Sequence, residues 1–255
     1  MTRRPLEIEV DLLPRFDATG ARPVDDRSRD VAIVVDVLRM TTTATVLAEL
    51  GLARLEVIAD VERARARARA AGALLLGERD ARRLPGFDGG NSPLEFTGVG
   101  VAGRNAVLCT TNGSAAVEAC APAAHVLLGC LRNAGAVARR ALALAPTSVR
   151  LVCAGTDGAV SLDDVVVAGC IVNALVGLEP GASLTDTALL ASAAARDADL
   201  GALLAGSRHG RRLLDAGFGD DVVEAARMDA SDRVLERLPG SRSVFACPSE
   251  QVAVE

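Results

Sequence analysis

The stretch VAIVVDVLRMTTTATVLAE, residues 31–49, decides the fold of this chain. Val31 to Val35 is an almost entirely β-branched apolar run, which is typical of a strand buried on both faces in a parallel sheet. The run stops at Asp36, and from Ala44 onward apolar residues recur at helical spacing. This order of strand, polar tip and helix predicts an α/β unit, in which ligands bind at the carboxyl ends of the strands.

The polar tip of this unit carries groups that suit an anion and a metal ion. Asp36 offers a carboxylate to a metal, and Arg39 offers a planar cation to a phosphate or sulfonate. Thr41, Thr42 and Thr43 place hydroxyls and backbone N–H groups near a helix N-terminus, where anions bind. The alternative is that Asp36 and the threonines only cap the helix and that Arg39 faces solvent.

The composition is that of a soluble globular protein of 255 residues with a net charge of −5. The chain is long enough for one large domain or two small ones. All 28 basic residues are arginine, and Trp and Tyr are absent, which argues against a general nucleic-acid-binding face. The longest apolar stretch, 165–178, contains Asn173 and is shorter than a membrane span, so we expect no membrane partner.

The cysteines and the N-terminus both indicate a cytoplasmic protein. Six cysteines stand at positions 109, 120, 130, 153, 170 and 247, and none forms a C-x-x-C pair. They are expected to be reduced thiols rather than a disulfide framework or a zinc site. The N-terminal sequence MTRRPLEIEVDLLPRF lacks an uninterrupted apolar core, so it is a poor signal peptide.

The rest of the chain mainly alternates strands with helices. Strands are expected at 6–12, 54–59, 73–76, 106–109, 125–129, 149–153 and 243–246. Helices are expected at 61–71, after 114, at 134–145, 161–178, 185–204, from 207 and at 221–227, with loops at 14–30 and 84–96. This order predicts a layered α/β/α fold with a largely parallel or mixed sheet and a helical C-terminal part. No linker divides the chain, so we expect a single α/β unit. If this unit has two lobes, they would be residues 1–178 and 179–255.

Three of the expected strand ends carry similar polar sequences. They are Asp36 with the RMTTT that follows Leu38, TTNGS at 110–114, and GTDG at 155–158. In a parallel sheet these tips would converge on one edge. Gly lets the backbone approach an oxyanion closely, and the hydroxyls of Thr and Ser add donors. The set predicts an oxyanion site with carboxylates nearby, as in metal-assisted phosphoryl transfer.

Two further segments are open to two interpretations. The long loop 84–96 offers Asp88, Asn91 and Ser92 to a substrate, but Asx turns and a helix cap at Ser92 would also explain them. Ser161 followed by Asp164 fits a capping box, whereas the functional alternative for the adjacent carboxylates is Mg²⁺ ligation.

Histidine and cysteine supply the remaining candidates for catalysis. His209 is a candidate proton donor to a leaving alkoxide, the alternative being a surface or capping role. Cys153 is a candidate nucleophile at a strand end, although position 159 holds Ala where a cysteine-phosphatase loop needs Arg. His125 begins an apolar strand and is expected to be structural. A Walker site is excluded because the chain has no lysine.

Six motifs, taken in order, resemble the 2-phosphosulfolactate phosphatase (ComB) family. They are DVLRMTTT (36–43), GERDARRLPGFDGGNSPLEF (77–96), TTNGS (110–114), GCLRNA (129–134), CAGTDGAVSLDD (153–164) and SRHGRRLLDAGF (207–218). The resemblance spans roughly residues 31–235 and departs conservatively at Met40 and Asp157. It implies an α/β fold, a homodimer, and Mg²⁺-dependent hydrolysis of 2-phospho-3-sulfolactate to 3-sulfolactate and phosphate on a route to coenzyme M.

The motifs and the resemblance together give a set of candidate site residues. The catalytic candidates are Asp36, Arg39, Cys153, Asp157 and His209. The candidates for binding a small anionic phosphate ester are Thr42, Thr43, Arg79, Asn91, Ser92, Thr110, Thr111, Asn112, Gly113, Asn133, Gly155, Thr156 and Arg208, with Arg132 a further cation for its carboxylate or sulfonate. The Mg²⁺ candidates are Asp36, Glu78, Asp163 and Asp164.

The residues leave the nucleophile and the exact function open. Either a metal-bound water or Asp36 itself would attack the phosphate. One rival function is hydrolysis of another 2-hydroxy-acid phosphate, and a rival from another class is a non-catalytic sensor of a phosphorylated metabolite. A sensor would bind the ester without metal-dependent release of phosphate.

Overall fold

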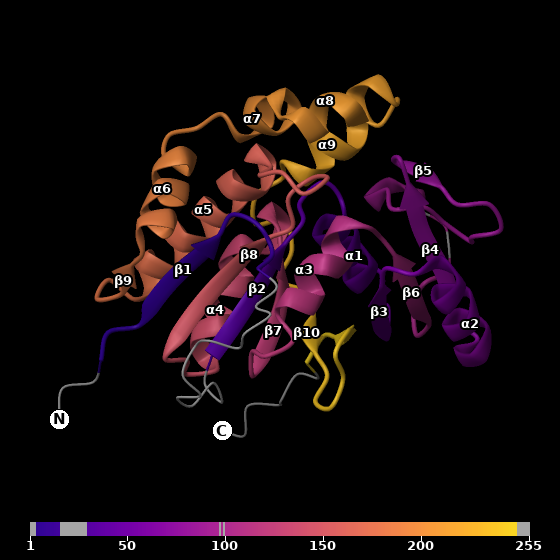
Figure 1. Cartoon of the computed structure of the whole chain (residues 1–255), viewed down its shortest axis with the longest axis horizontal. Coiled ribbons are helices and arrows are strands. Elements are labelled where there is room, and N and C mark those ends of the chain that lie inside the picture. The colour runs from indigo at the N-terminus through magenta and orange to yellow at the C-terminus, as the bar shows by residue number, and fades with distance from the viewer. Residues whose placement is uncertain (1–3, 16–29, 97, 99, 249–255) are drawn as a thin grey trace.

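A computed structural model describes residues 4–15, 30–96, 98 and 100–248 (Figure 1), so most of the expected loop at 14–30 lies outside the described residues. The strands are β1 (Glu7–Asp11), β2 (Asp30–Val35), β3 (Arg54–Ile58), β4 (Leu74–Arg79), β5 (Arg82–Arg83), β6 (Asn105–Cys109), β7 (His125–Gly129), β8 (Ser148–Cys153), β9 (Ser183–Leu184), β10 (Glu236–Arg237) and β11 (Val244–Ala246). The α-helices are α1 (Met40–Glu49), α2 (Val61–Ala71), α3 (Asn112–Ala119), α4 (Ala134–Ala143), α5 (Leu162–Leu178), α6 (Asp186–Ala195), α7 (Leu200–Gly206), α8 (Arg208–Asp215) and α9 (Gly219–Ala225). Short 3₁₀ turns are η2 (Pro93–Phe96) and η3 (Leu131–Asn133).

The sheet is mixed, with strand order β5-β4-β6-β3-β11-β10-β7-β2-β8-β1-β9. It contains two parallel blocks, β4-β6-β3 and β7-β2-β8-β1. The short strands β10 and β11 lie between these blocks and pair with their neighbours in antiparallel orientation. The prediction of a layered α/β fold with a parallel or mixed sheet is therefore confirmed.

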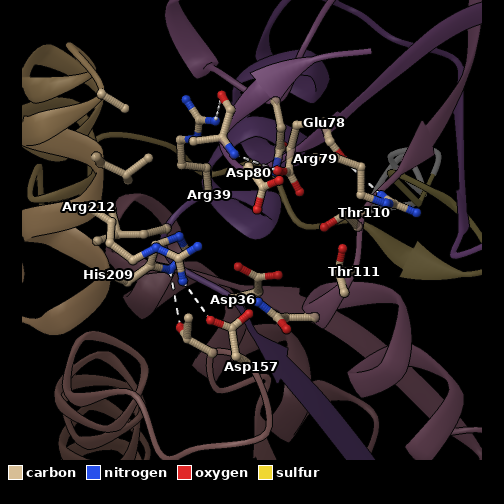
Figure 2. Close-up of a pocket in the computed structure, with 17 residues that line it drawn as sticks. Asp36, Arg39, Glu78, Arg79, Asp80, Thr110, Thr111, Asp157, His209 and Arg212 are labelled. Atoms are coloured by element: carbon tan, nitrogen blue, oxygen red, sulfur yellow. Dashed lines mark hydrogen bonds and ion pairs between the residues drawn. The ribbon is translucent and has the colours of Figure 1, made fainter.

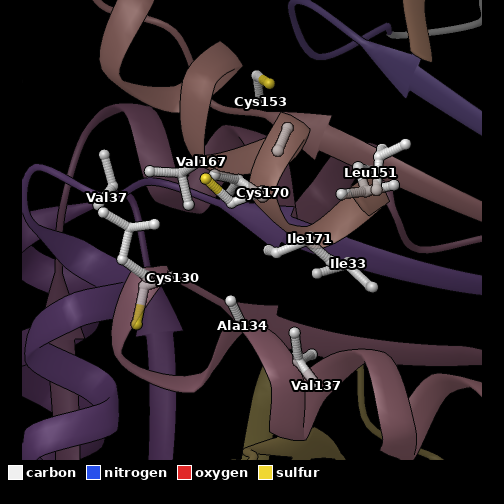
Figure 3. Packing of buried hydrophobic residues seen from close by; sticks show 14 of the residues in the cluster. Ile33, Val37, Cys130, Ala134, Val137, Leu151, Cys153, Val167, Cys170 and Ile171 are labelled. Carbon is white, nitrogen blue, oxygen red and sulfur yellow. The ribbon is translucent and has the colours of Figure 1, made fainter. Parts of the chain in front are cut away.

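Strand β2 is the centre of the core because its side chains alternate between the two faces of the sheet. Ile33 joins a cluster with residues of α4 and α5, such as Val137 and Ile171 (Figure 3). Ala32 and Val34 face the opposite side and join a second cluster with residues of α1 and α3. Every residue of β2 from Val31 onward is buried, as the β-branched run predicted.

The C-terminal helices cross the carboxyl ends of the central strands (Figure 1). Leu204, Leu213 and Val222, from α7, α8 and α9, belong to the same hydrophobic cluster as β2 and α5. The prediction of one continuous helix over 185–204 was wrong. The chain breaks at Asp197, which has a positive φ of 53°, and the Asp199 carboxylate then caps α7 by accepting the N–H of Ala202 at 3.0 Å.

Two simpler predictions were also tested. All six cysteines are free thiols, as their spacing indicated. Within the described part of the chain, no helix combines the length and apolar character that a membrane crossing requires.

Candidate active site

A cavity of about 240 Å³ lies where β2, β4, β6 and β8 end, with α8 along one wall (Figure 2). Its predicted lining residues are Asp36, Arg39, Glu78, Arg79, Asn91, Thr110, Thr111, Asn112, Thr156, Asp157 and His209. Further lining residues that the sequence did not single out are Leu38, Asp80, Ala81, Arg212, Leu213 and Ala216. Figure 2 shows Arg39 and His209 on one side and Thr110 and Thr111 on the other, with Asp36 between them. The three polar strand ends thus converge on one cavity; those after β2 and β8 come from neighbouring parallel strands, and that after β6 comes from the other parallel block.

Asp36 follows β2 directly and is only 6% exposed. Burial raises its pKa to about 7, and the negative charges of Asp163 and Glu78 act in the same direction. The backbone N–H of Met40, 3.4 Å from Asp36 Oδ1, and the charge of Arg39 oppose this shift only in part. Asp36 is therefore a carboxylate whose negative charge lacks full compensation within the protein.

Gly113 allows the third helix to approach this carboxylate. A Cβ at position 113 would lie 2.5 Å from Asp36 Oδ2, closer than any real side chain tolerates. Thr110 and Asn112 precede and begin α3, so their polar groups line the cavity beside Asp36. Thr111 is the N-cap of α3, yet its hydroxyl makes no capping hydrogen bond and it is exposed at the cavity. The N-terminus of α3 therefore presents donors toward the space that an anion would fill.

Asp163 and Asp164 begin α5 beneath the cavity, and neither lines it. The predicted capping box does not form: Ser161 instead donates its hydroxyl to Asp163 Oδ1 at 2.5 Å. Asp164 accepts the N–H groups of Val37 at 3.0 Å and Gly155 at 2.9 Å. Burial, followed by the charges of Asp163 and Asp36, raises the pKa of Asp164 well above its ordinary value. These carboxylates hold the loops after β2 and β8 together under Asp36.

Arg39 is 4% exposed, and its guanidinium forms part of the cavity wall. Nη1 donates to Asp221 Oδ2 at 2.6 Å, and Nη2 donates to the carbonyl oxygen of Ala81 at 2.9 Å. The guanidinium also stacks on the ring of Phe218, 4.4 Å from its centroid. Arg39 is therefore held in place by α9, by the turn before it, and by the turn between β4 and β5.

The loop after β8 and helix α8 form a second charged wall. The Thr156 hydroxyl lies 3.3 Å from His209 Nδ1. Asp157, with a positive φ of 53°, pairs with Arg212 at 2.6 Å, and Arg208 donates to the carbonyl oxygen of Thr156 at 2.6 Å. Burial is the main cause that lowers the pKa of His209. This direction favours a neutral ring, which must first accept a proton before it can donate one to a leaving alkoxide, the role that the sequence predicted.

Glu78 and Arg79 end strand β4 at the edge of the cavity. Glu78 Oε2 accepts the N–H of Ala81 at 3.0 Å. Arg79 donates to the carbonyl oxygens of Glu78 at 2.8 Å and Ala59 at 2.7 Å, and it lies 3.7 Å from the thiol of Cys109. Since these acceptors are uncharged, the cation of Arg79 differs from those of Arg39 and Arg212, which have carboxylate partners.

Several predicted site residues lie outside the cavity lining, in structural contacts. The hydroxyls of Thr42 and Thr43 donate to the carbonyl oxygens of Val37 and Asn91, at 2.7 and 2.9 Å. The remaining ones are Ser92, Gly113, Asn133, Cys153, Gly155, Arg208, Asp163 and Asp164. Asp88 also lies outside the lining and accepts the N–H of Leu75 at 2.8 Å, a long-range structural contact rather than the local Asx turn that was the alternative to substrate binding.

Asn133 and Cys153 are fully buried away from the cavity lining. Asn133 binds the N–H of Cys130 at 2.9 Å and the carbonyl oxygen of Arg233 at 3.0 Å, beside the far end of α1. Cys153 is fully buried, and this burial raises the pKa of its thiol well above the ordinary value. A thiol of this kind stays protonated and is a poor nucleophile.

The residues at the cavity suit a Mg²⁺ ion that is shared with a substrate. Among residues 4–15, 30–96, 98 and 100–248, no three His, Cys, Asp or Glu side chains gather into a ready-made metal site. Mg²⁺, however, is commonly held by one or two carboxylates, with water and substrate phosphate completing its shell. Asp36 and Glu78 both line the cavity, and the charge of Asp36 is poorly compensated. This donor set fits such a shared ion and does not fit one enclosed by protein ligands alone.

Arg212 and Asp221 were not predicted as site residues, although both lie in or near the motif at 207–218. Arg212 stands in the motif at 207–218, one helical turn after His209, so helical spacing was a usable signal. Asp221 lies in the first turn of α9, where an acidic residue has an ordinary explanation as a helix-terminal charge. Its contact with Arg39 depends on how α9 packs, which no local pattern reveals.

Comparison with known proteins gives one consistent result. A sequence model described as 2-phosphosulpholactate phosphatase matches residues 19–238. A protein of Deinococcus radiodurans is 44% identical over 238 residues, which cover 92% of this chain and 95% of the relative. Proteins of Gloeobacter violaceus and a Synechococcus species are 40% and 38% identical, covering 81% and 80% of this chain and 87% of each relative. All three relatives are named "Probable 2-phosphosulfolactate phosphatase".

Proposed function

This chain belongs to the 2-phosphosulpholactate phosphatase family and is a phosphoric monoester hydrolase, and we propose that it converts 2-phospho-3-sulfolactate to 3-sulfolactate and phosphate with Mg²⁺. The observation that carries the proposal is the cavity at the strand ends. It combines the poorly compensated carboxylate of Asp36 with hydroxyl, N–H and arginine donors in about 240 Å³. A small ester with several negative charges, bound together with a cation, matches these groups.

Asp36 and Glu78 are the residues that would hold Mg²⁺. When bound, the ion would neutralise charge on the phosphate oxygens. Asp163 and Asp164 lie below the cavity, and their hydrogen bonds to Ser161, Val37 and Gly155 shape the loop that presents Asp36. They support the proposed metal site indirectly, in place of the direct ligation that the sequence led us to expect.

Different walls of the cavity suit different anionic groups of the substrate. The α3 N-terminus, Thr110 and Arg39 face Asp36, so the phosphate belongs there. Arg79, which donates to the carbonyl oxygens of Glu78 and Ala59, is suited to the sulfonate or carboxylate at the rim. Arg212 pairs with Asp157. It would give up part of that contact to bind whichever of the sulfonate and carboxylate Arg79 does not hold.

His209 supplies proton transfer. The lowered pKa keeps its ring neutral near neutral pH, so it accepts a proton from the attacking water. Oxygen of that water forms the new bond to phosphorus, and the bond from phosphorus to the ester oxygen breaks. The proton held by His209 then passes to the departing alkoxide, which leaves as the hydroxyl of sulfolactate.

The test is phosphate release from racemic 2-phosphosulfolactate and from 2-phospholactate, each with Mg²⁺ and with EDTA. We expect release that requires Mg²⁺ and is faster with the sulfonated ester. Equal rates for both esters would favour a broader 2-hydroxy-acid phosphatase. Tight binding without release would favour the sensor.

The cellular setting forms the last part of the proposal. We propose a cytoplasmic homodimer that acts on a route to coenzyme M. Six free cysteines support a reducing compartment. The homodimer and the route rest on the family resemblance and stay predictions.

A further inference from the structure

We infer that Asp221, which lies outside the cavity lining, is a positioning residue that holds the Arg39 guanidinium in the phosphate-binding wall. The inference deepens the proposed function, because it rests on Arg39 binding the phosphate group. Asp221 is 2% exposed and belongs to the first turn of α9. Its sequence position, far from the strand ends, gave no sign of this role.

Both oxygens of Asp221 are used, and each contacts a different segment of the active site. Oδ2 accepts Arg39 Nη1 at 2.6 Å, and Oδ1 accepts the hydroxyl of Ser92 at 2.6 Å. Ser92 directly follows Asn91, whose side chain lines the cavity and whose carbonyl oxygen accepts the Thr43 hydroxyl. One carboxylate therefore joins α9, the tip before α1 and the long loop 84–96.

The contacts of Arg39 fix the orientation of its donors. A guanidinium carries five N–H groups in one plane. Asp221 and the Ala81 carbonyl oxygen occupy one N–H on each terminal nitrogen, and Phe218 covers one flat face. The other donors remain for the cavity that Arg39 lines. Without Asp221, the guanidinium would lose its charged anchor and could turn toward the carboxylates on the opposite wall.

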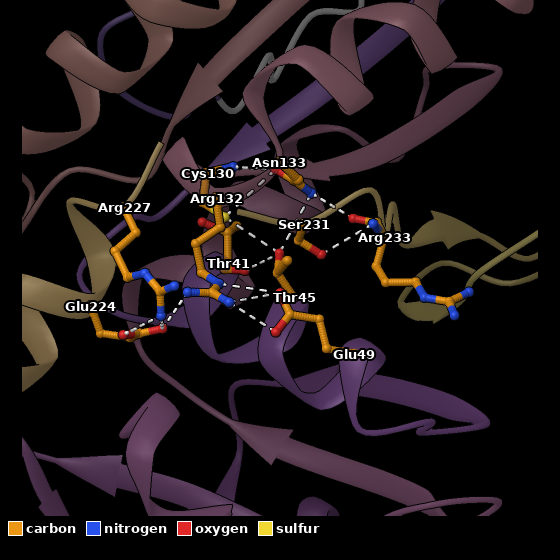
Figure 4. A network of polar contacts seen from close by, with 10 residues as sticks. All are labelled: Thr41, Thr45, Glu49, Cys130, Arg132, Asn133, Glu224, Arg227, Ser231 and Arg233. Carbon is orange, nitrogen blue, oxygen red and sulfur yellow. Dashed lines mark hydrogen bonds and ion pairs between the residues drawn. The ribbon is translucent and has the colours of Figure 1, made fainter. Parts of the chain in front are cut away.

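Helix α9 also provides a matched control, one turn further along. Glu224 pairs with Arg132, whose side chain is about as buried as that of Arg39 (5% and 3% exposed). Arg132 lies beside Glu49 at the far end of α1 and does not line the cavity (Figure 4). The two pairs share a helix, a chemistry and a degree of arginine burial. They differ in whether the arginine faces the cavity and in the second carboxylate, Glu49, that Arg132 also contacts.

The experiment compares Asp221→Asn with Glu224→Gln in the full chain. Inorganic phosphate is the binding probe, measured by calorimetry, and kcat and KM are measured with 2-phosphosulfolactate and Mg²⁺. We expect Asp221→Asn to weaken phosphate binding about 10-fold and to lower kcat/KM about 100-fold, because Arg39 loses its orientation. Glu224→Gln should leave both quantities within about two-fold of wild type, because Arg132 does not line the cavity and keeps its pairing with Glu49.

Equal effects of the two substitutions on phosphate affinity, or no effect of either, would overturn the inference. If Asp221→Asn does not fold, Ser92→Ala replaces it, since it removes the hydroxyl donor to Asp221 and otherwise only a longer contact with the N–H of Leu94 at 3.3 Å. That variant should weaken phosphate binding about three-fold, and wild-type affinity would count against the inference. The affinity for inorganic phosphate is measured without turnover, so it tests the inference separately from the proposed function. If the proposed function fails, wild-type protein would bind inorganic phosphate but would not hydrolyse the ester.

Discussion

Two buried polar clusters lie at the two ends of helix α1, and they compensate their charges differently. In the Arg132 cluster, Arg132 pairs with Glu49 at 2.8 Å and with Glu224, so positive and negative groups meet directly (Figure 4). In the Asp36 cluster, made of Asp36, Glu78, Asp163 and Asp164, carboxylates lie near other carboxylates. Burial raises the pKa of Asp36 to about 7 and that of Asp164 well above its ordinary value.

The difference separates a cluster that stabilises the fold from one that is prepared for a ligand. Charges paired within the protein need nothing further. Carboxylates buried without enough cations are a cost to the folded state, and such sites occur where function requires them. A bound cation and the phosphate it brings would complete the Asp36 cluster in the way that Glu49 and Glu224 complete the Arg132 cluster.

The largest expected effect is the pH dependence of stability that Asp36 contributes. Its pKa is about 7 in the folded chain and 3.8 for an ordinary aspartate, so between about pH 4 and 7 the folded chain keeps a proton that the unfolded chain has lost. The free energy of unfolding therefore falls as pH rises through this window, by up to about 4 kcal/mol from this group. Urea unfolding in EDTA should show that Asp36→Asn gains stability over wild type between these pH limits. An identical pH dependence in both proteins would contradict the assigned shift.

The next largest expected effect is the loss of folding stability when the Arg132 cluster loses its cation. Arg132→Met leaves Glu49 and Glu224 without their shared cation, so we expect a loss of about 3 kcal/mol in the free energy of unfolding. Turnover per folded molecule should stay within about two-fold of wild type. Arg227→Met is the control, because exposed Arg227 contacts the same Glu224 at 3.3 Å and should cost less than about 1 kcal/mol. A large loss of turnover in folded Arg132→Met would remove the distinction between the clusters.

Substitution of His209 is expected to have a smaller effect, and this effect is on the activation barrier of the reaction rather than on the free energy of unfolding. His209→Gln should lower kcat about 100-fold, or about 3 kcal/mol, because the proton acceptor is lost. In wild type, kcat/KM should rise as the pH passes through the pKa of His209, which lies below its ordinary value of 6.5. The variant should lack this rise. His125→Gln is the matched control, since His125 pairs with Glu236 at the opposite end of β7. Unchanged kcat in His209→Gln would exclude the proposed proton transfer.

Arg79 is expected to give the smallest effect, on substrate choice. Arg79→Met should raise KM for 2-phosphosulfolactate about 10-fold, or about 1.4 kcal/mol, and should change KM for 2-phospholactate less. Exposed Arg82, in the paired strand β5, supplies the control variant Arg82→Met. Equal changes in KM for the two esters would assign Arg79 to a group that both substrates share.

The position of the Asp36 cluster could be predicted from the sequence because it depends on local patterns. The β-branched run at 31–35 sets β2, and the polar tips after β2 and β8 meet because these neighbouring strands are parallel and end on the same side of the sheet. The strand–helix order was sufficient for the α/β class. These features follow from periodicity and from residues adjacent in the chain.

The orientation of individual side chains could not be predicted in the same way. The Thr42 hydroxyl points to a backbone carbonyl, although hydroxyls beside a phosphate site look like ligands in sequence. Asp221 and Arg212 reach the site only because α8 and α9 pack across the strand ends. The insertion of β10 and β11 between two parallel blocks likewise depends on long-range pairing. Each of these outcomes is decided by contacts between distant segments.

The most direct test of the central claim compares Asp36→Asn with Arg132→Met in one assay of phosphate release from 2-phosphosulfolactate with Mg²⁺. Both substitutions remove one charged group from a buried cluster beside α1, and both are measured at a temperature where circular dichroism shows a folded chain. We predict that Asp36→Asn loses about 10³-fold or more in kcat, whereas Arg132→Met keeps near-normal turnover. Near-normal turnover in Asp36→Asn would contradict the claim that the uncompensated cluster is the active site.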